Sequence, residues 1–235
     1  MNVLVVDVGG TSVKMLVTGE TEPRKFASGP TLTAAGMVAG VKEATKDWRY
    51  DVVSVGYPGP VLHNKPVIEP ANLGTGWVAF DYKKAFGHPV KVVNDAAMQA
   101  LGSYQGGKLL FLGLGTGLGT TMIVDGVIEP MELAHLPYKK ATYEDYVGLR
   151  GLKRYGKKKW RQLVIDVVEK LVAALEPTDV VIGGGNVHKL EDLPPGTRVG
   201  DNANAFVGGF RLWEESEKRR PDPKPKKSSK RSRRK

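Results

Sequence analysis

The chain contains no cysteine and only four histidines among its 235 residues. The lack of cysteine excludes disulfides and thiolate metal sites, and it is usual for a cytoplasmic protein. No apolar run approaches the roughly 20 residues that span a bilayer. The first ten residues have an apolar stretch but neither a basic segment nor a cleavage site, so they predict a strand and not a signal peptide. We therefore expect a cytoplasmic globular protein that does not act on a membrane.

Acidic residues are scarce only near the C-terminal end. Residues 217–235 hold eleven Lys and Arg but two Asp and Glu, a net charge of +9, which leaves +1 for residues 1–216. This segment is too polar to pack, so we expect a disordered basic tail. One hypothesis is that the tail holds a polyanion near the folded part, and the alternative is a merely solubilising segment. Because no aromatic residue follows Trp213, the tail predicts at most non-specific binding of nucleic acid.

Two pairs of predicted strands are each joined by a glycine-rich turn. The first pair covers residues 3–8 and 13–17, and the second covers 109–114 and 120–124. The repeat predicts an α/β fold of two similar lobes that face each other, at residues 1–95 and 96–216. Periodicity and breakers predict helices at 33–48, 96–104 and 160–175, and further strands at 51–55, 89–93 and 179–182.

The first turn reads Asp7-Val8-Gly9-Gly10-Thr11-Ser12-Val13-Lys14. Glycines let backbone N–H groups face an anion, and hydroxyls and a lysine add donors and charge. Asp7, at the end of a strand, is placed to hold hydrated Mg²⁺. The alternative is a plain glycine hairpin.

The second turn, residues 112–120, alternates glycine with other residues. It lacks the GxGxxG-to-helix pattern of dinucleotide sites and the Gly-Lys-Ser/Thr of a Walker loop. We interpret it as a second phosphate cradle, with a glycine-kinked sheet as the alternative.

Three further segments carry candidate chemistry. Asn94-Asp95 follows a predicted strand, where a carboxylate can accept a proton from a hydroxyl or can cap the next helix. Glu132 and His135 lie three residues apart in a loop and could bind vicinal hydroxyls, a metal or merely each other. Gly183-Gly184-Gly185-Asn186 follows a buried strand and either lets a flat ligand approach the backbone or forms a simple turn.

In this order the segments resemble the actin-like ATPase superfamily and, within it, the ROK family of bacterial sugar kinases. The resemblance covers residues 2 to about 215 and is most specific in the C-terminal third, where it points to polyphosphate glucokinases. The residues that carry it are Gly156-Lys157-Lys158-Lys159-Trp160, Val181-Ile182-Gly183-Gly184-Gly185-Asn186, Leu193-Pro194-Pro195-Gly196, Gly200-Asp201-Asn202 and Ala205-Phe206-Val207-Gly208-Gly209-Phe210-Arg211-Leu212-Trp213.

The resemblance implies a role for each matching residue. Asp95 would be the general base on the 6-hydroxyl of glucose. The sugar hydroxyls would be bound by Asn72, Asn94, Glu132, His135 and Glu144. The transferred phosphate would face Gly9, Gly10, Thr11 and Lys14 from one lobe and Gly115, Thr116 and Gly117 from the other. Adenosine would lie on Gly184, Gly185 and Asn186.

The implied reaction is phosphorylation of glucose at its 6-hydroxyl by polyphosphate or ATP, with Mg²⁺. The cysteine-rich zinc motif of many ROK proteins is absent, so we expect no zinc, and the usual Glu-x-Gly-His reads Glu-Leu-Ala-His here. The alternatives are an ATP-dependent kinase of another hexose and a sugar-sensing regulator. Regulators of the family carry an N-terminal DNA-binding module, whereas the first hairpin begins at residue 3, so we expect an enzyme. A homodimer is compatible with the sequence.

Overall fold

The computed structural model describes residues 1–201 and 203–218. A first sheet of five strands has the order β3-β2-β1-β4-β7. Its strands are β1 (Val3–Val8), β2 (Ser12–Val17), β3 (Arg24–Ala27), β4 (Val52–Tyr57) and β7 (Val90–Asn94). β1, β2 and β3 pair antiparallel, while β4 and β7 continue the sheet in parallel with β1.

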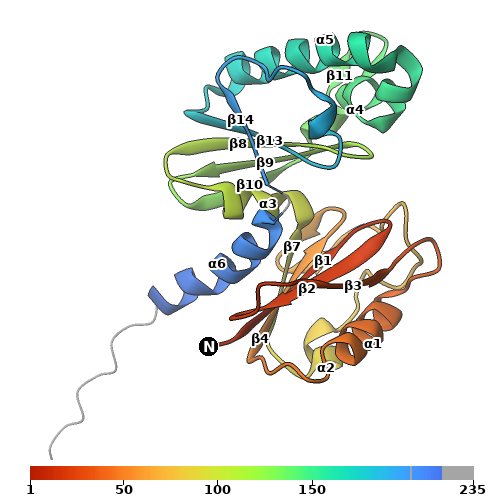
Figure 1. Ribbon diagram of the computed structural model, residues 1–235, viewed down its shortest axis with the longest axis vertical. Helices are drawn as coiled ribbons and strands as arrows, with labels where there is room; N and C mark the ends of the chain where they lie inside the picture. The colour runs from red at the N-terminus through yellow and green to blue at the C-terminus, as the bar shows by residue number, and fades with distance from the viewer. Residues whose placement is uncertain (202, 219–235) are drawn as a thin grey trace, which may run out of the picture.

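A second sheet of five strands has the order β10-β9-β8-β13-β14. Its strands are β8 (Lys108–Leu114), β9 (Leu118–Val124), β10 (Val127–Met131), β13 (Asp179–Gly183) and β14 (Thr197–Val199). Three strands again pair antiparallel and two continue in parallel. The two sheets therefore share one topology, and they form the lower and upper lobes of Figure 1. The prediction of a two-lobed α/β fold is confirmed.

Helices and short hairpins complete each lobe. The lower lobe has α1 (Ala34–Ala44), α2 (Tyr82–Phe86) and the hairpin of β5 (Val61–Leu62) and β6 (Lys65–Pro66). The upper lobe has α4 (Tyr143–Val147), α5 (Leu149–Leu175), the hairpin of β11 (Pro137–Tyr138) and β12 (Ala141–Thr142), and the 3₁₀ turns η1 (Leu133–His135) and η2 (Val187–Lys189). Local sequence sets their ends: the side chain of Thr33 caps α1 at the N–H of Gly36, as predicted, and Gly87 ends α2 with a φ of 78°.

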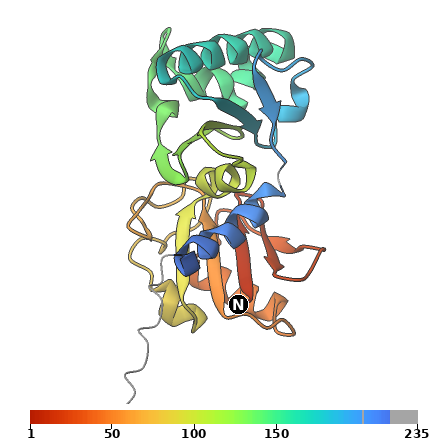
Figure 2. The same ribbon diagram turned by 90° about the vertical axis from the view of Figure 1, so that its left-hand side faces the viewer.

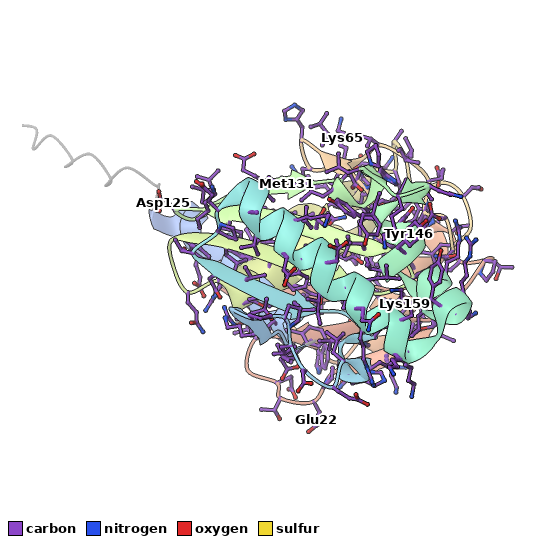
Figure 3. The ribbon with its side chains drawn as sticks, turned by 90° about the horizontal axis from the view of Figure 1, so that it is seen from above. Glu22, Lys65, Asp125, Met131, Tyr146 and Lys159 are labelled. Atoms are coloured by element: carbon purple, nitrogen blue, oxygen red, sulfur yellow. The ribbon has the colours of Figure 1, made fainter. Side chains whose placement is uncertain are left out.

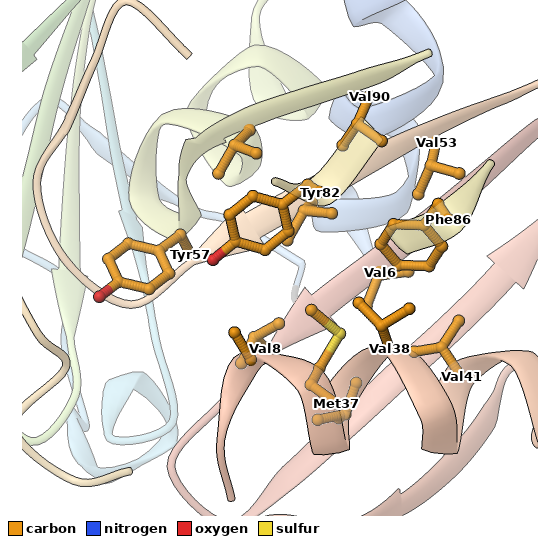
Figure 4. Packing of buried hydrophobic residues seen from close by; sticks show 14 of the residues in the cluster. Val6, Val8, Met37, Val38, Val41, Val53, Tyr57, Tyr82, Phe86 and Val90 are labelled. Carbon is orange, nitrogen blue, oxygen red and sulfur yellow. The ribbon is translucent and has the colours of Figure 1, made fainter. Parts of the chain in front are cut away.

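Each lobe has its own apolar core. In the lower lobe, valines of β1 and β4 pack against Met37 and Val41 of α1 and against Tyr82 and Phe86 of α2 (Figure 4). In the upper lobe, strands β8 and β13 pack against α5, where Trp160 is fully buried and donates its indole N–H to the carbonyl of Val147 at 2.7 Å. Residues of both lobes line one cavity between these two cores, which suits a protein that holds a ligand between its lobes.

Helix α3 (Asp95–Ser103) lies between the lobes, and α6 (Asn204–Lys218) begins beside it and runs along the lower lobe (Figures 1 and 2). The two helices can approach closely because glycines lie at their contact. A β-carbon on Gly102 would lie only 1.9 Å from the carbonyl oxygen of Asn204, and one on Gly208 only 1.8 Å from that of Met98. α6 also packs on β1 and β4, so the last helix lies against the first sheet. The division at residue 95 stays a prediction, and the chain crosses between the lobes twice.

Some elements differ from the predicted bounds. α1 ends at Ala44 and not at residue 48, and the Thr45 hydroxyl donates to the carbonyl of Val41. α5 begins eleven residues before the predicted helix and is kinked at Gly156, whose φ is 72°. The basic tail predicted from residue 217 lies outside the described residues from 219 onward. No helix in the described part of the chain is both long enough and apolar enough to cross a membrane.

Candidate active site

The end of β1 brings a carboxylate and an ammonium group together. Asp7 on β1 is the antiparallel partner of Lys14 on β2, so both side chains lie on one face of the sheet. Burial raises the pKa of Asp7 above its usual value, and the charge of Lys14 opposes that shift. The pair therefore places a carboxyl group and an ammonium group next to the first glycine turn.

The first glycine turn is held by backbone contacts. The N–H of Gly9 donates to the carbonyl of Ser12 at 3.0 Å, and the hydroxyl of Ser28 donates to the carbonyl of Gly9 at 2.6 Å. Asn72 lies beside the turn: a β-carbon added to Gly10 would be 3.4 Å from the β-carbon of Asn72. The turn is thus a fixed loop whose exposed glycine faces the space between the lobes.

Helix α3 begins with Asp95. The side chain of Asn94 caps this helix by accepting from the N–H of Ala97 at 3.1 Å, and its amide donates to the carbonyl of Gly59 at 3.0 Å. The Asp95 carboxylate accepts from the neighbouring N–H of Ala96 at 2.8 Å. Asn94 is therefore the cap, and the carboxylate of Asp95 faces the cavity.

Burial is the main reason that the pKa of Asp95 is raised to about 7, and the charges of Asp7 and Glu132 add to the effect. A carboxyl group in this range is poised to take up a proton near neutral pH. Raised pKa values of this kind are typical of functional sites.

A row of three glycines crosses the second sheet where α3 begins. Gly113 on β8 pairs with Gly119 on β9 and with Gly183 on β13. A β-carbon on Gly119 would lie 3.0 Å from that of Ala96, and one on Gly183 would lie 2.8 Å from the ring of Phe111. Gly119 therefore leaves room for the start of α3, which carries Asp95, whereas Gly113 and Gly183 leave room for the ring of Phe111.

The second turn, residues 115–117, is tied to two other segments. Asn186 is buried and donates its side-chain amide to the carbonyl of Gly115 at 2.9 Å. The N–H of Leu149, the first residue of α5, donates to the carbonyls of Gly115 and Thr116 at 3.2 and 3.1 Å. Gly184 lies against Leu114 with a φ of 85°. The glycine segment at 183–186 therefore supports the turn directly.

An imidazole lies between two carboxylates on the upper side of the cavity. Nε2 of His135 is 3.7 Å from Glu132, and Nδ1 is 3.8 Å from Glu144. Burial raises the pKa of Glu132, with a further contribution from Glu144, while His135 lowers it. The group offers acceptors and a ring nitrogen to a hydroxylated ligand. Among the residues that the structure describes, no group of three or more His, Cys, Asp or Glu side chains has the arrangement to hold a metal.

One cavity of about 620 Å³ collects most of the predicted site. The predicted residues that line it are Asp7, Gly9, Gly10, Lys14, Asn72, Asp95, Gly115, Thr116, Gly117, Glu132, His135, Glu144, Gly184, Gly185 and Asn186. Asn94 and Thr11 do not line it, because Asn94 caps α3 and Thr11 is exposed at the tip of the turn. Sequence reasoning missed Pro58, Gln99, Phe111 and Leu149, of which Gln99 could have been found one helical turn after Asp95.

A two-lobed fold with glycine turns on both sides of a cavity is the actin-like fold. Solved structures agree: the chain matches an inorganic polyphosphate/ATP-glucomannokinase from Arthrobacter sp. with a TM-score of 0.79 and 22% identity, over 92% of this chain and 99% of that one. It matches a ROK family glucokinase from Streptomyces griseus, in complex with glucose and AMPPNP, with a TM-score of 0.73 and 18% identity over 92% and 100% of the two chains.

The sequence comparisons narrow this class to one family. The model of the ROK family matches residues 3–129, which is more than half of the chain, and the protein belongs to that family. A polyphosphate glucokinase of Mycobacterium tuberculosis is 27% identical over 81% of this chain and 80% of its own length. A glucokinase of Pyrobaculum calidifontis is 28% identical over 52% and 43% of the two chains. Together these similarities support a sugar kinase.

Proposed function

We propose that the protein transfers a phosphoryl group from inorganic polyphosphate or ATP to the 6-hydroxyl of glucose. The observation that carries this proposal is the placement of Asp95 between the two glycine turns, with a pKa raised to about 7. A base so placed can accept the proton of a hydroxyl while the oxygen attacks phosphorus. The names of the relatives supply the sugar and the two donors.

The sugar would lie against Glu132, His135 and Glu144, with Asn72 on the opposite side. Charged acceptors bind hydroxyls more strongly than neutral ones. His135 touches both carboxylates and would keep them in place. The sugar would thereby present one hydroxyl to Asp95, and this positioning contributes much of the rate in phosphoryl transfer.

The phosphate donor would lie between the two glycine turns. Backbone N–H groups and Lys14 would neutralise the charge that spreads over the transferred group. Asp7 and Asp95 share the cavity, and the charge of Asp7 helps to raise the pKa of Asp95. This excess of negative charge fits a hydrated Mg²⁺ held by Asp7, since Mg²⁺ needs only one or two carboxylates beside phosphates. When bound, Mg²⁺ would supply positive charge to the donor oxygens.

The proposal is tested by glucose 6-phosphate formation with Mg²⁺ and either long-chain polyphosphate or ATP, measured side by side. Mannose serves as a second acceptor, because one structural relative is a glucomannokinase. We expect product from glucose with at least one donor. If neither donor phosphorylates glucose while mannose is phosphorylated, the hexose is wrong; if neither acceptor reacts, the proposed function is wrong.

The first prediction concerns pH. The base is active only without its proton, so kcat/KM at saturating Mg²⁺ should rise with pH and level off above about 7, the pKa of Asp95. Below that value the rate should fall about tenfold for each pH unit. An initial-rate profile from pH 5 to 9 measures this. A profile that is flat down to pH 5 would show that no such group titrates in the reaction.

The second prediction concerns the sugar side. Glu132→Gln and His135→Ala should each raise the KM for glucose, by roughly tenfold for the loss of a charged hydrogen bond. Their effect on the KM of the phosphate donor should be smaller. Glu129→Gln is the matched control, because Glu129 is exposed on β10 and does not line the cavity. An unchanged glucose KM in both variants would show that Glu132 and His135 do not bind the sugar and that their loop has only a structural role.

A further inference from the structure

A group of six cations lies on the upper lobe, on α5 and in the turn between β11 and β12. This α5 basic patch consists of Lys139, Lys140, Lys153, Arg154, Lys157 and Lys158, all exposed. Within the described part of the chain, none of the six forms an ion pair with a carboxylate. The neighbouring acids are already paired, Asp145 with Arg150 and Asp166 with Lys170. The patch therefore has positive charge to offer to a ligand.

Two stacked tyrosine rings link Lys139, in the turn between β11 and β12, with Arg154 on α5. The rings of Tyr146 and Tyr155 stack with centroids 5.4 Å apart. The ammonium of Lys139 lies 5.8 Å from the Tyr146 ring, and the guanidinium of Arg154 lies 5.3 Å from the Tyr155 ring. Such contacts hold the cationic side chains in place without neutralising them. Tyr146 and Lys159 lie on the same side of the upper lobe, opposite Asp125 (Figure 3).

The patch lies one helical turn from a residue that lines the cavity. Leu149 lines the cavity and binds the second glycine turn through its N–H, and Lys153 follows four residues later on the same helix. Four residues are about one helical turn, or roughly 6 Å along the axis. The kink at Gly156 then redirects the helix, and Lys157 and Lys158 follow it directly. Cations thus lead away from the turn that would face the transferred phosphate.

We propose that the α5 basic patch binds the distal part of an extended inorganic polyphosphate chain whose terminal phosphate occupies the cavity. This rests on the proposed function and assigns the donor to that site. A repeating anion matches a series of unpaired cations, whereas the phosphates of ATP end in a nucleoside. RNA would also be attracted to such a surface, but it presents no terminal phosphate chain to the second turn. Continuity with the cavity therefore favours polyphosphate.

The test compares two quadruple variants of the full chain. One carries Lys153→Ala, Arg154→Ala, Lys157→Ala and Lys158→Ala. The matched control carries Lys42→Ala, Arg49→Ala, Lys83→Ala and Lys84→Ala, which removes the same charge from exposed positions on and after α1 and on α2. α1 and α2 lie at the far end of the other lobe (Figure 1). Residues 219–235 are the same in both, so their charge cancels in the comparison.

We expect the α5 variant to raise the KM for long-chain polyphosphate by about tenfold or more at low salt, with the difference shrinking at high salt. For flexible polyanions, log K falls with log salt by roughly 0.7 for each contact, so the loss of four contacts should flatten the salt dependence visibly. The KM values for glucose and ATP should stay within about twofold, because neither substrate reaches the patch. The control variant should match the wild type.

Direct binding of long-chain polyphosphate without glucose, measured by calorimetry, separates this inference from the proposed function. If the wild type binds polyphosphate and only the α5 variant loses that binding, the patch is established even if no sugar is phosphorylated. Equal behaviour of the two variants would overturn the inference. Tighter binding of a single-stranded RNA oligomer than of polyphosphate, lost in the same variant, would also overturn it and make the patch a nucleic-acid surface.

Discussion

Asp95→Asn should reduce kcat by about 10²- to 10⁴-fold, the usual contribution of a general base, and should leave the KM for glucose nearly unchanged. Asparagine keeps the shape and can still accept from the N–H of Ala96, but it cannot take up the proton. The matched control is Asp125→Asn, at an exposed turn away from the cavity, where asparagine tolerates the φ of 49°. Retention of more than about a third of the wild-type kcat would be far outside that range and would remove Asp95 as the base.

The same variant has a signature in stability. The pKa of Asp95 is raised in the folded protein, so between about 4 and 7 the folded state binds a proton that the unfolded state has released. Stability contributed by that proton is therefore lost as the pH rises towards 7. Asparagine carries no charge, so the variant should melt higher than the wild type at pH 8, and the two should converge near pH 4. One pKa unit corresponds to about 1.4 kcal/mol, or roughly 2–4 °C in a chain of this size.

Gly184→Ala should damage both stability and use of the phosphate donor. The φ of Gly184 is 85°, and a β-carbon there would lie 2.6 Å from the carbonyl oxygen of Leu114. Left-handed strain costs about 1–2 kcal/mol, and overpacking adds typically 1–3 kcal/mol. A shift of this segment would also move Asn186 away from Gly115, so kcat/KM for the donor should fall by tenfold or more while the glucose KM changes less.

Gly87→Ala is the control that isolates the clash. Gly87 has a similar φ of 78°, but a β-carbon there meets nothing within 4 Å. The Gly87→Ala variant should lose only the stability that the left-handed φ costs, and it should keep full activity. The measurements are the melting temperatures of both variants and their kinetics with the phosphate donor. If Gly184→Ala behaves like Gly87→Ala in both, the contact between residues 184 and 114 does not support the second turn.

The fold was largely predictable because its signals are local and repeated. Continuous apolar runs before glycine turns identify β1 and β8, and Thr33 identifies the start of α1. The missed elements depend on distant partners. α6 forms where Gly102 and Gly208 let two helices touch, and a single sequence does not show which glycines meet. A helix can also continue through an isolated glycine, so the sequence does not show that Gly156 takes a φ of 72° and kinks α5.

The residue types that form the site could be predicted from the sequence, but the roles of several individual residues could not. Glycine turns and isolated carboxylates indicate phosphate chemistry by residue type, and the structure brings fifteen of the predicted residues into one cavity. Pattern could not show that the amide of Asn94 is used by the helix cap, or that Gly119 makes room for the start of α3. Those roles depend on which strands pair and how closely the helix approaches, which are properties of the folded chain.

The most direct test of the central account is the identity of the product. Phosphorus NMR of the reaction with glucose, Mg²⁺ and each donor should show a phosphate ester on the 6-oxygen. The same reaction with 6-deoxyglucose, which fits the same hydroxyl contacts but lacks the acceptor, should form no sugar phosphate. An ester at any other oxygen, or equal product from 6-deoxyglucose, would contradict the placement of Asp95 at the 6-hydroxyl.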